Sequence, residues 1–115
     1  MTEEVAKPVL KVETGFLRRE VNGDLTDQAR QLGWSVFWMT LDSGSQVRIA
    51  SPPGITSAIE QSISHFRKDS RYRNQQQFYF KLGLRSAGDP KNNRWVIETM
   101  HYATVDKAEM DRISK

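Results

Sequence analysis

The sequence predicts a single α+β domain, in which about five mainly antiparallel strands form one sheet and two main helices cover one of its faces. Three observations favour this class. Runs rich in β-branched and aromatic residues alternate with segments of helical spacing, turn-forming residues separate them, and a length of 115 residues suits one domain. We expect residues 1–8 to form a disordered tail and residues 9–115 to form the domain.

The first elements of the domain are a strand, a short helix and a second strand. Apolar residues dominate 9–21, which predicts a strand that is interrupted or bent at Gly15. A short helical pattern follows and ends at Gly33, a residue suited to the left-handed position after a helix. Residues 34–41 are β-branched and aromatic and nearly apolar on both faces, so we expect a central strand there.

The remaining elements return the chain to the same sheet. A turn at 42–45 leads into a strand over 46–50, and isoleucines at helical spacing predict a second helix over 55–66. Residues 78–85 alternate cleanly between apolar and polar, and 94–102 form the return strand before a last short helix. The resulting order is β-α-β-β-α-β-β-α. Its first six elements match the split β-α-β-β-α-β plan, so we expect a ferredoxin-like variant.

Positive charge is concentrated in one stretch of the chain, between His65 and Arg94. This stretch carries eight Lys and Arg side chains against Asp69 and Asp89, a balance of +6, whereas the whole chain is +3 and the remainder is therefore −3. Clustered cations attract phosphates more strongly than the same charges spread evenly. The candidate nucleic-acid-binding residues are these cations and two tyrosines that can stack on bases: Arg67, Lys68, Arg71, Tyr72, Arg73, Tyr79, Lys81, Arg85, Lys91 and Arg94.

We therefore expect a small non-enzymatic protein that binds nucleic acid, DNA or RNA, in single-stranded form or with little sequence selectivity. This hypothesis requires the basic segment after the second helix to lie beside the cations of the following hairpin. A competing explanation is that the cations of residues 67–73 complement a helix C-terminus and keep a small protein soluble.

A protein-interaction module is the alternative function. Such a protein, an accessory subunit or an inhibitor, would dock on a larger assembly through an exposed sheet face or edge. Trp34 and Trp38 share one strand face, and an exposed aromatic strip flanked by Arg48 or Arg94 would suit a protein partner or a homodimer. These rings also suit the core of a domain of this size, and their spacing alone does not separate core from interface.

The sequence contains little that indicates an enzyme. His65 and His101 are the only histidines, and neither belongs to a metal-binding pair at helical spacing. The serines lie outside nucleophile motifs, no glycine-rich phosphate loop opens a helix, and the chain has no cysteine. We therefore expect no catalytic residue, metal or cofactor. The acidic N-terminus and the lack of a long apolar run predict a cytoplasmic protein that does not bind membranes.

Overall fold

The computed structural model describes residues 10–20, 25–86 and 94–113, so the tail predicted for residues 1–8 lies outside the described part. Strands and helices follow one another here in the predicted order. The elements are β1 (Leu10–Glu20), α1 (Asp27–Gln31), β2 (Ser35–Leu41), β3 (Gln46–Ser51), α2 (Pro53–Arg67), β4 (Phe78–Ser86), β5 (Arg94–Thr104) and α3 (Lys107–Ile113).

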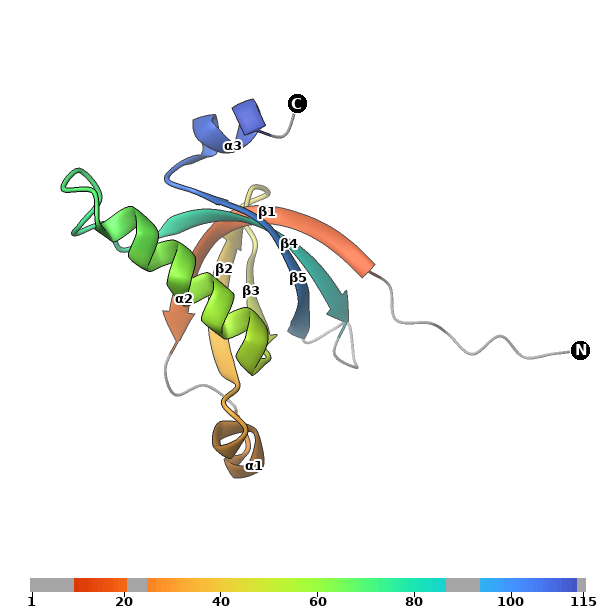
Figure 1. The fold of residues 1–115 in the computed structure, drawn as a ribbon. Helices are drawn as coiled ribbons and strands as arrows, with labels where there is room; N and C mark the ends of the chain where they lie inside the picture. Colours follow the sequence, from red (N-terminus) through yellow and green to blue (C-terminus); the bar gives the residue numbers. More distant parts are fainter. Residues whose placement is uncertain (1–9, 21–24, 87–93, 114–115) are drawn as a thin grey trace, which may run out of the picture.

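The strands form a closed barrel in the order β1-β2-β3-β5-β4 (Figure 1). β1 pairs antiparallel with β2 on one edge and with β4 on the other, which closes the sheet on itself. β3 and β5 run parallel over residues 48–50 and 94–96. The predicted open, ferredoxin-like sheet is therefore wrong, because each of the five strands has a neighbour on both edges, so no strand is left at an end of the sheet and its inner face encloses the core.

Closure of the barrel depends on β1, which curves strongly along its length (Figure 1). Gly15 lies opposite Leu41 of β2 and Phe80 of β4, so both edges of the strand are occupied at this residue. A β-carbon at Gly15 would lie 2.2 Å from the backbone oxygen of Thr40, far inside contact distance. Only glycine therefore lets β2 approach β1 this closely.

Apolar side chains from the strands fill the barrel, and α2 adds to them. Ile59 of α2 is fully buried, and Phe66 stacks on Phe78 of β4 with ring centroids 5.4 Å apart. α1, in contrast, has five residues and buries none of them, so the expected second covering helix does not exist. The buried core consists of Leu17, Phe37, Met39, Val47, Ile49, Ile59, Phe78, Phe80, Leu82, Leu84 and Ile97.

A hydrogen-bonded carboxylate joins three parts of the barrel at the turn between β2 and β3. Asp42 accepts a hydrogen bond of 2.5 Å from Thr14 of β1 and another from the hydroxyl of Tyr79 of β4. Burial acts to raise the pKa of Asp42, but these two hydrogen bonds and the positive charge of Lys107 together outweigh it and leave the pKa below its ordinary value. Burial, together with the bond to Asp42, raises the pKa of Tyr79 to about 12.

The close approach of β1 and β2 at Gly15 predicts that a single methyl group added at this residue strongly destabilises the fold. Gly15→Ala is expected to lower the free energy of unfolding by about 3 kcal/mol or more, because the added carbon meets rigid backbone rather than a movable side chain. Gly54→Ala is the matched control, since its added carbon has nothing within 4 Å, and we expect it to be neutral or slightly stabilising. Urea unfolding measures both values, and equal stabilities of the two variants would contradict this account of closure.

The carboxylate at the β2–β3 turn predicts a pH-dependent loss of stability. Because the folded pKa of Asp42 is depressed, its ionised form stabilises the fold above its ordinary value of 3.8, and this contribution disappears as pH falls through the folded pKa. Tyr79→Phe is expected to cost about 2 kcal/mol at neutral pH, by removal of one hydrogen bond to a charged acceptor, and less in acid. Tyr102→Phe, at an exposed tyrosine, is the control for urea unfolding at both pH values. If Tyr79→Phe lowers the free energy of unfolding equally at both pH values, the ionised carboxylate of Asp42 is not the acceptor through which Tyr79 stabilises the fold.

Candidate nucleic-acid interface

Four of the predicted cations lie at the C-terminal end of α2 and in the turn beyond it. Arg67 is the last residue of the helix and Lys68 is its C-cap, while Arg73 lies in the turn. All three side chains are exposed, and Arg67 donates a hydrogen bond of 3.4 Å to the backbone oxygen of Gln75. These residues form what we call the helix-end group, together with Arg71 and Tyr72.

Arg71 is neutralised within this group. Its guanidinium donates to both carboxylate oxygens of Asp69, at 2.6 Å for the shortest bond, and its central carbon lies 5.0 Å from the ring centre of Tyr72. The hydrogen bonds from the Arg71 side chain and backbone lower the pKa of Asp69 to about 2. The ring of Tyr72 is half-buried against the core, so it offers at most one face to a base.

The predicted residues of β4 differ in how far they are available to a ligand. Tyr79 is 1% exposed and its hydroxyl is bonded to Asp42, so its predicted role as a stacking group is wrong. The amino group of Lys81 lies 5.9 Å from the ring centre of Tyr102, which is 44% exposed. Arg85 donates two hydrogen bonds of 2.6 Å to the carboxylate of Glu98 on β5, so its charge is locally compensated.

The predicted cations do not all gather on one surface. β4 begins beside the turn that follows α2 and ends at the far side of the barrel (Figure 1). Arg85 is four residues beyond Lys81, about 13 Å at strand spacing, and lies in register with Val96. The expected groove is thus divided into the helix-end group and a neutralised pair at Arg85. Lys91 and the side chain of Arg94 lie outside the described part of the structure.

A different arrangement of cations and aromatic surface crosses the outside of the barrel. Trp38 of β2 lies directly opposite Arg18 of β1 on one side and Arg48 of β3 on the other. Directly paired residues share one face of a sheet, so these three side chains form one row. We call Arg18, Trp38 and Arg48 the outer row. In register, the row continues to the backbone of Arg94 on β5.

The outer row faces outwards because its neighbours along each strand fill the core. Phe37 and Met39, the neighbours of Trp38 along β2, are buried in the core. Val47 and Ile49, the neighbours of Arg48 along β3, are buried as well. Arg18 is exposed, whereas Trp38 and Arg48 are half-buried.

Within the outer row, cation and ring are in contact. The guanidinium carbon of Arg48 lies 4.8 Å from the ring centre of Trp38. An aromatic strip flanked by Arg48 or Arg94 was predicted from the sequence for a protein partner or a homodimer, whereas Arg18 was not predicted. The sequence did contain a signal for the pairing of Trp38 with Arg48. A tight hairpin turn at residues 42–45 fixes these two residues opposite each other.

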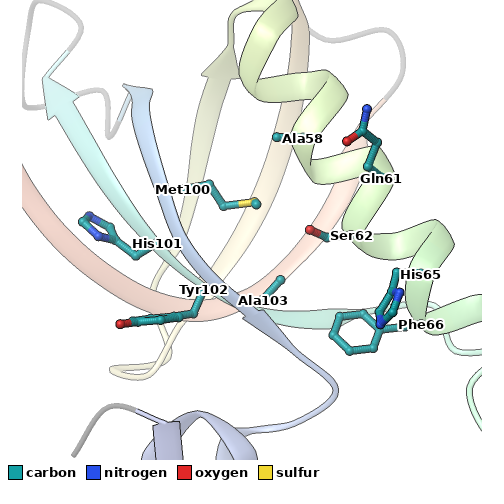
Figure 2. A pocket seen from close by; sticks show the side chains of 9 residues that line it. All are labelled: Ala58, Gln61, Ser62, His65, Phe66, Met100, His101, Tyr102 and Ala103. Carbon is teal, nitrogen blue, oxygen red and sulfur yellow. The ribbon is translucent and has the colours of Figure 1, made fainter.

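A groove of about 480 Å³ lies between α2 and β5 (Figure 2). Met100 points towards the helix, whereas His101 points away from it and lies 3.1 Å from the hydroxyl of Thr99 (Figure 2). His65, on the α2 wall, packs edge-on against Phe66. The two histidines therefore do not converge, and no cluster of three His, Cys, Asp or Glu in the described residues is arranged to hold a metal ion.

No protein-family model, curated protein or solved structure matches this chain. Among the helices that the structure describes, none is long and apolar enough to cross a membrane.

The ion pair in the helix-end group predicts a titration that can be observed directly. The carboxyl of Asp69 is expected to titrate at about 2, well below its ordinary value of 3.8, and Arg71→Gln should return it towards that value. Lys68→Gln is the matched control, since it removes a neighbouring cation without touching the bonds to Asp69. Carboxyl chemical shifts measured by NMR across acidic pH provide the test, and an ordinary midpoint in the wild-type protein would contradict the pairing.

Proposed function

We propose that this protein is a non-enzymatic nucleic-acid-binding protein that holds single-stranded DNA or RNA with little sequence selectivity. The observation that carries the proposal is the outer row, in which two guanidinium groups flank a tryptophan in register across three strands. Guanidinium groups neutralise phosphates, and an aromatic ring stacks on any base because every base has a π-face. The row therefore combines the two chemical groups that sequence-independent recognition of a single strand requires.

The position of the row on the barrel supports the same function by analogy. Five-stranded barrels of the OB-fold type bind oligonucleotides on the face of their second and third strands. Trp38 and Arg48 lie on β2 and β3 of the barrel described here. A shared architecture supports the location of a binding face, whereas the function itself has to be argued from the side chains.

The helix-end group supplies a second positive region. Arg67, Lys68 and Arg73 are exposed, and their charges would attract a polyanion at longer range even where they do not contact it. Arg71 and Arg85 contribute less, because each is held by a carboxylate. We therefore assign direct contacts to the outer row and an auxiliary electrostatic role to the helix-end group.

Charge reversal tests the proposal. The double variant Arg18→Glu/Arg48→Glu is expected to bind oligo(dT) and oligo(U) at least about tenfold more weakly at low salt. Its plot of log affinity against log salt should flatten by about 1.4, which corresponds to two lost phosphate contacts on a single strand. Fluorescence anisotropy of labelled oligonucleotides over a salt series measures both quantities.

A matched control changes the same charge elsewhere. Lys107→Glu/Arg112→Glu reverses two exposed cations on α3 and alters the net charge by the same amount. We expect it to retain most of the affinity and the wild-type salt slope. Equal losses in the two double variants, or binding that is indifferent to salt, would contradict the proposal.

The second candidate is a protein-interaction module, which the exposed ring of Tyr102 beside the α2–β5 groove favours. Affinity capture from a lysate separates the two functions, because a nucleic-acid tether is destroyed by nuclease whereas a direct protein contact persists. A partner retained after nuclease treatment, and lost on Tyr102→Ser, would favour this second function over the first.

A further inference from the structure

The contact that joins β5 to β3 is short, and β5 continues well beyond it. β5 pairs with β4 over residues 95–104 but with β3 only over residues 94–96. Among the described residues, no strand pairs with this side of β5 after Val96, and α2 faces it across the groove instead (Figure 2). A helix satisfies its own main-chain groups, so it does not pair with a strand edge. Main-chain groups on this side of β5 are therefore open to an extended chain.

Two irregularities bend β5 as it leaves β3. The register with β4 skips Glu98 and His101, so each is an extra residue on β5. Such bulges bend the strand that carries them, and both lie beyond the last pair with β3. From Tyr102 to Thr104 the register with β4 is regular again. The segment Tyr102–Thr104 is therefore the part of this edge that can accept an added strand.

The groove between α2 and β5 runs along this edge. Its β5 wall consists of residues 100–103, successive residues whose side chains point to both faces of the sheet (Figure 2). A space that touches both faces of a strand borders its main-chain edge. A second groove of about 470 Å³ shares Phe66 and Ala103 with the first and continues to Arg71 and Arg112. We call the two together the edge groove.

The edge groove is apolar in its middle and positively charged at one end. Met100 points towards α2, and Phe66 lines both halves of the groove (Figure 2). Arg71 belongs to the helix-end group, which therefore borders the far half. Residues 67–73 carry four cations against Asp69, a balance of +3. Acidic groups on a ligand would be attracted to this end of the groove.

We propose that the edge groove binds an extended peptide segment of a partner protein, which adds a short strand to β5 at Tyr102–Thr104 and places acidic side chains against the helix-end group. In strand addition, main-chain hydrogen bonds supply affinity and pockets for alternate side chains supply specificity. Nucleic acid lacks the alternating N–H and C=O groups that pair with a strand edge. No residue of the outer row lines the edge groove, so this inference does not rest on the proposed function.

Selection from random peptides tests the class of ligand. Peptides of about eight residues are long enough to span residues 100–105 when extended, and they can be displayed on phage and selected on the wild-type protein. Enriched peptides are expected to carry Asp or Glu at one end and apolar residues at alternate positions of the remainder. The most enriched peptide is then synthesised, and a scrambled peptide of the same composition should bind more weakly.

Methylation of the peptide main chain separates strand addition from docking by side chains alone. A strand that pairs along one edge uses the N–H groups of alternate residues. Single N-methyl groups should therefore weaken binding at least about tenfold at every second position of the paired stretch, because each removes a hydrogen bond and leaves a carbonyl unpaired. The positions between them should tolerate methylation. Isothermal titration calorimetry with the wild-type protein measures the whole series.

Variants of the protein place the peptide in the groove. Ser62 lines the groove, so Ser62→Tyr should fill the space that the peptide needs and weaken binding at least about tenfold (Figure 2). Ser57→Tyr, at an exposed residue of α2 outside this groove, is the matched control and should retain binding. Lys68→Glu/Arg73→Glu reverses two exposed cations of the helix-end group and should weaken binding about fivefold or more at low salt.

The outcomes distinguish failure of this inference from failure of the proposed function. Enrichment of no acidic peptide, a methylation series without alternation, or peptide binding that survives Ser62→Tyr overturns the peptide site. Loss of peptide binding on Arg18→Glu/Arg48→Glu also overturns it, because the peptide then only imitates nucleic acid at the outer row. Peptide binding by a protein that binds no oligonucleotide overturns the proposed function alone. The methylation series needs no substitution in the protein, so it decides the question even if a variant fails to fold.

Discussion

The close approach of β1 and β2 at Gly15 is the constraint on which the rest of the structure depends. The backbone oxygen of Thr40 occupies the space that any side chain at residue 15 would need. β1 pairs with β2 along one edge and with β4 along the other, so this close contact lies on a strand that both neighbours hold in the barrel, and it fits the β1–β2 register. The position of Arg18 opposite Trp38 follows from the same register, three residues further along the strand.

Successive side chains along each strand point alternately into and out of the barrel, and this alternation produces both the core and the outer row. Phe37 and Met39 must point inwards to fill the barrel, and Trp38 between them must therefore point outwards. A shift of one residue in pairing would bury Arg48 and expose the apolar neighbours on either side of it, at a large cost in stability. The free energy of core packing thus also fixes the geometry of cations and ring that we assign to nucleic acid.

The net charge of a stretch of sequence overstates the positive charge that the protein surface presents to a ligand. Arg71 is compensated by Asp69, two residues away, and Arg85 by Glu98 on the adjacent strand. The stretch with the largest positive balance therefore contains paired cations, and the two arginines of the outer row lie outside that stretch. The outer row follows from the alternation of side chains along the strands and from the pairing register, neither of which a local net charge reveals.

The sequence by itself determined the order of strands and helices, an irregularity of the first strand at Gly15 and a tight hairpin at residues 42–45, because these depend on local backbone preferences and turn chemistry. It predicted an open sheet, since short-range patterns do not reveal that the third strand pairs with the fifth and so closes the barrel. Only the tertiary structure decided that β1 and β4 pair, that Tyr79 is buried against Asp42, and that Arg18 joins the outer row. These contacts join residues at least 20 positions apart, and they depend on packing the whole barrel rather than on any single segment.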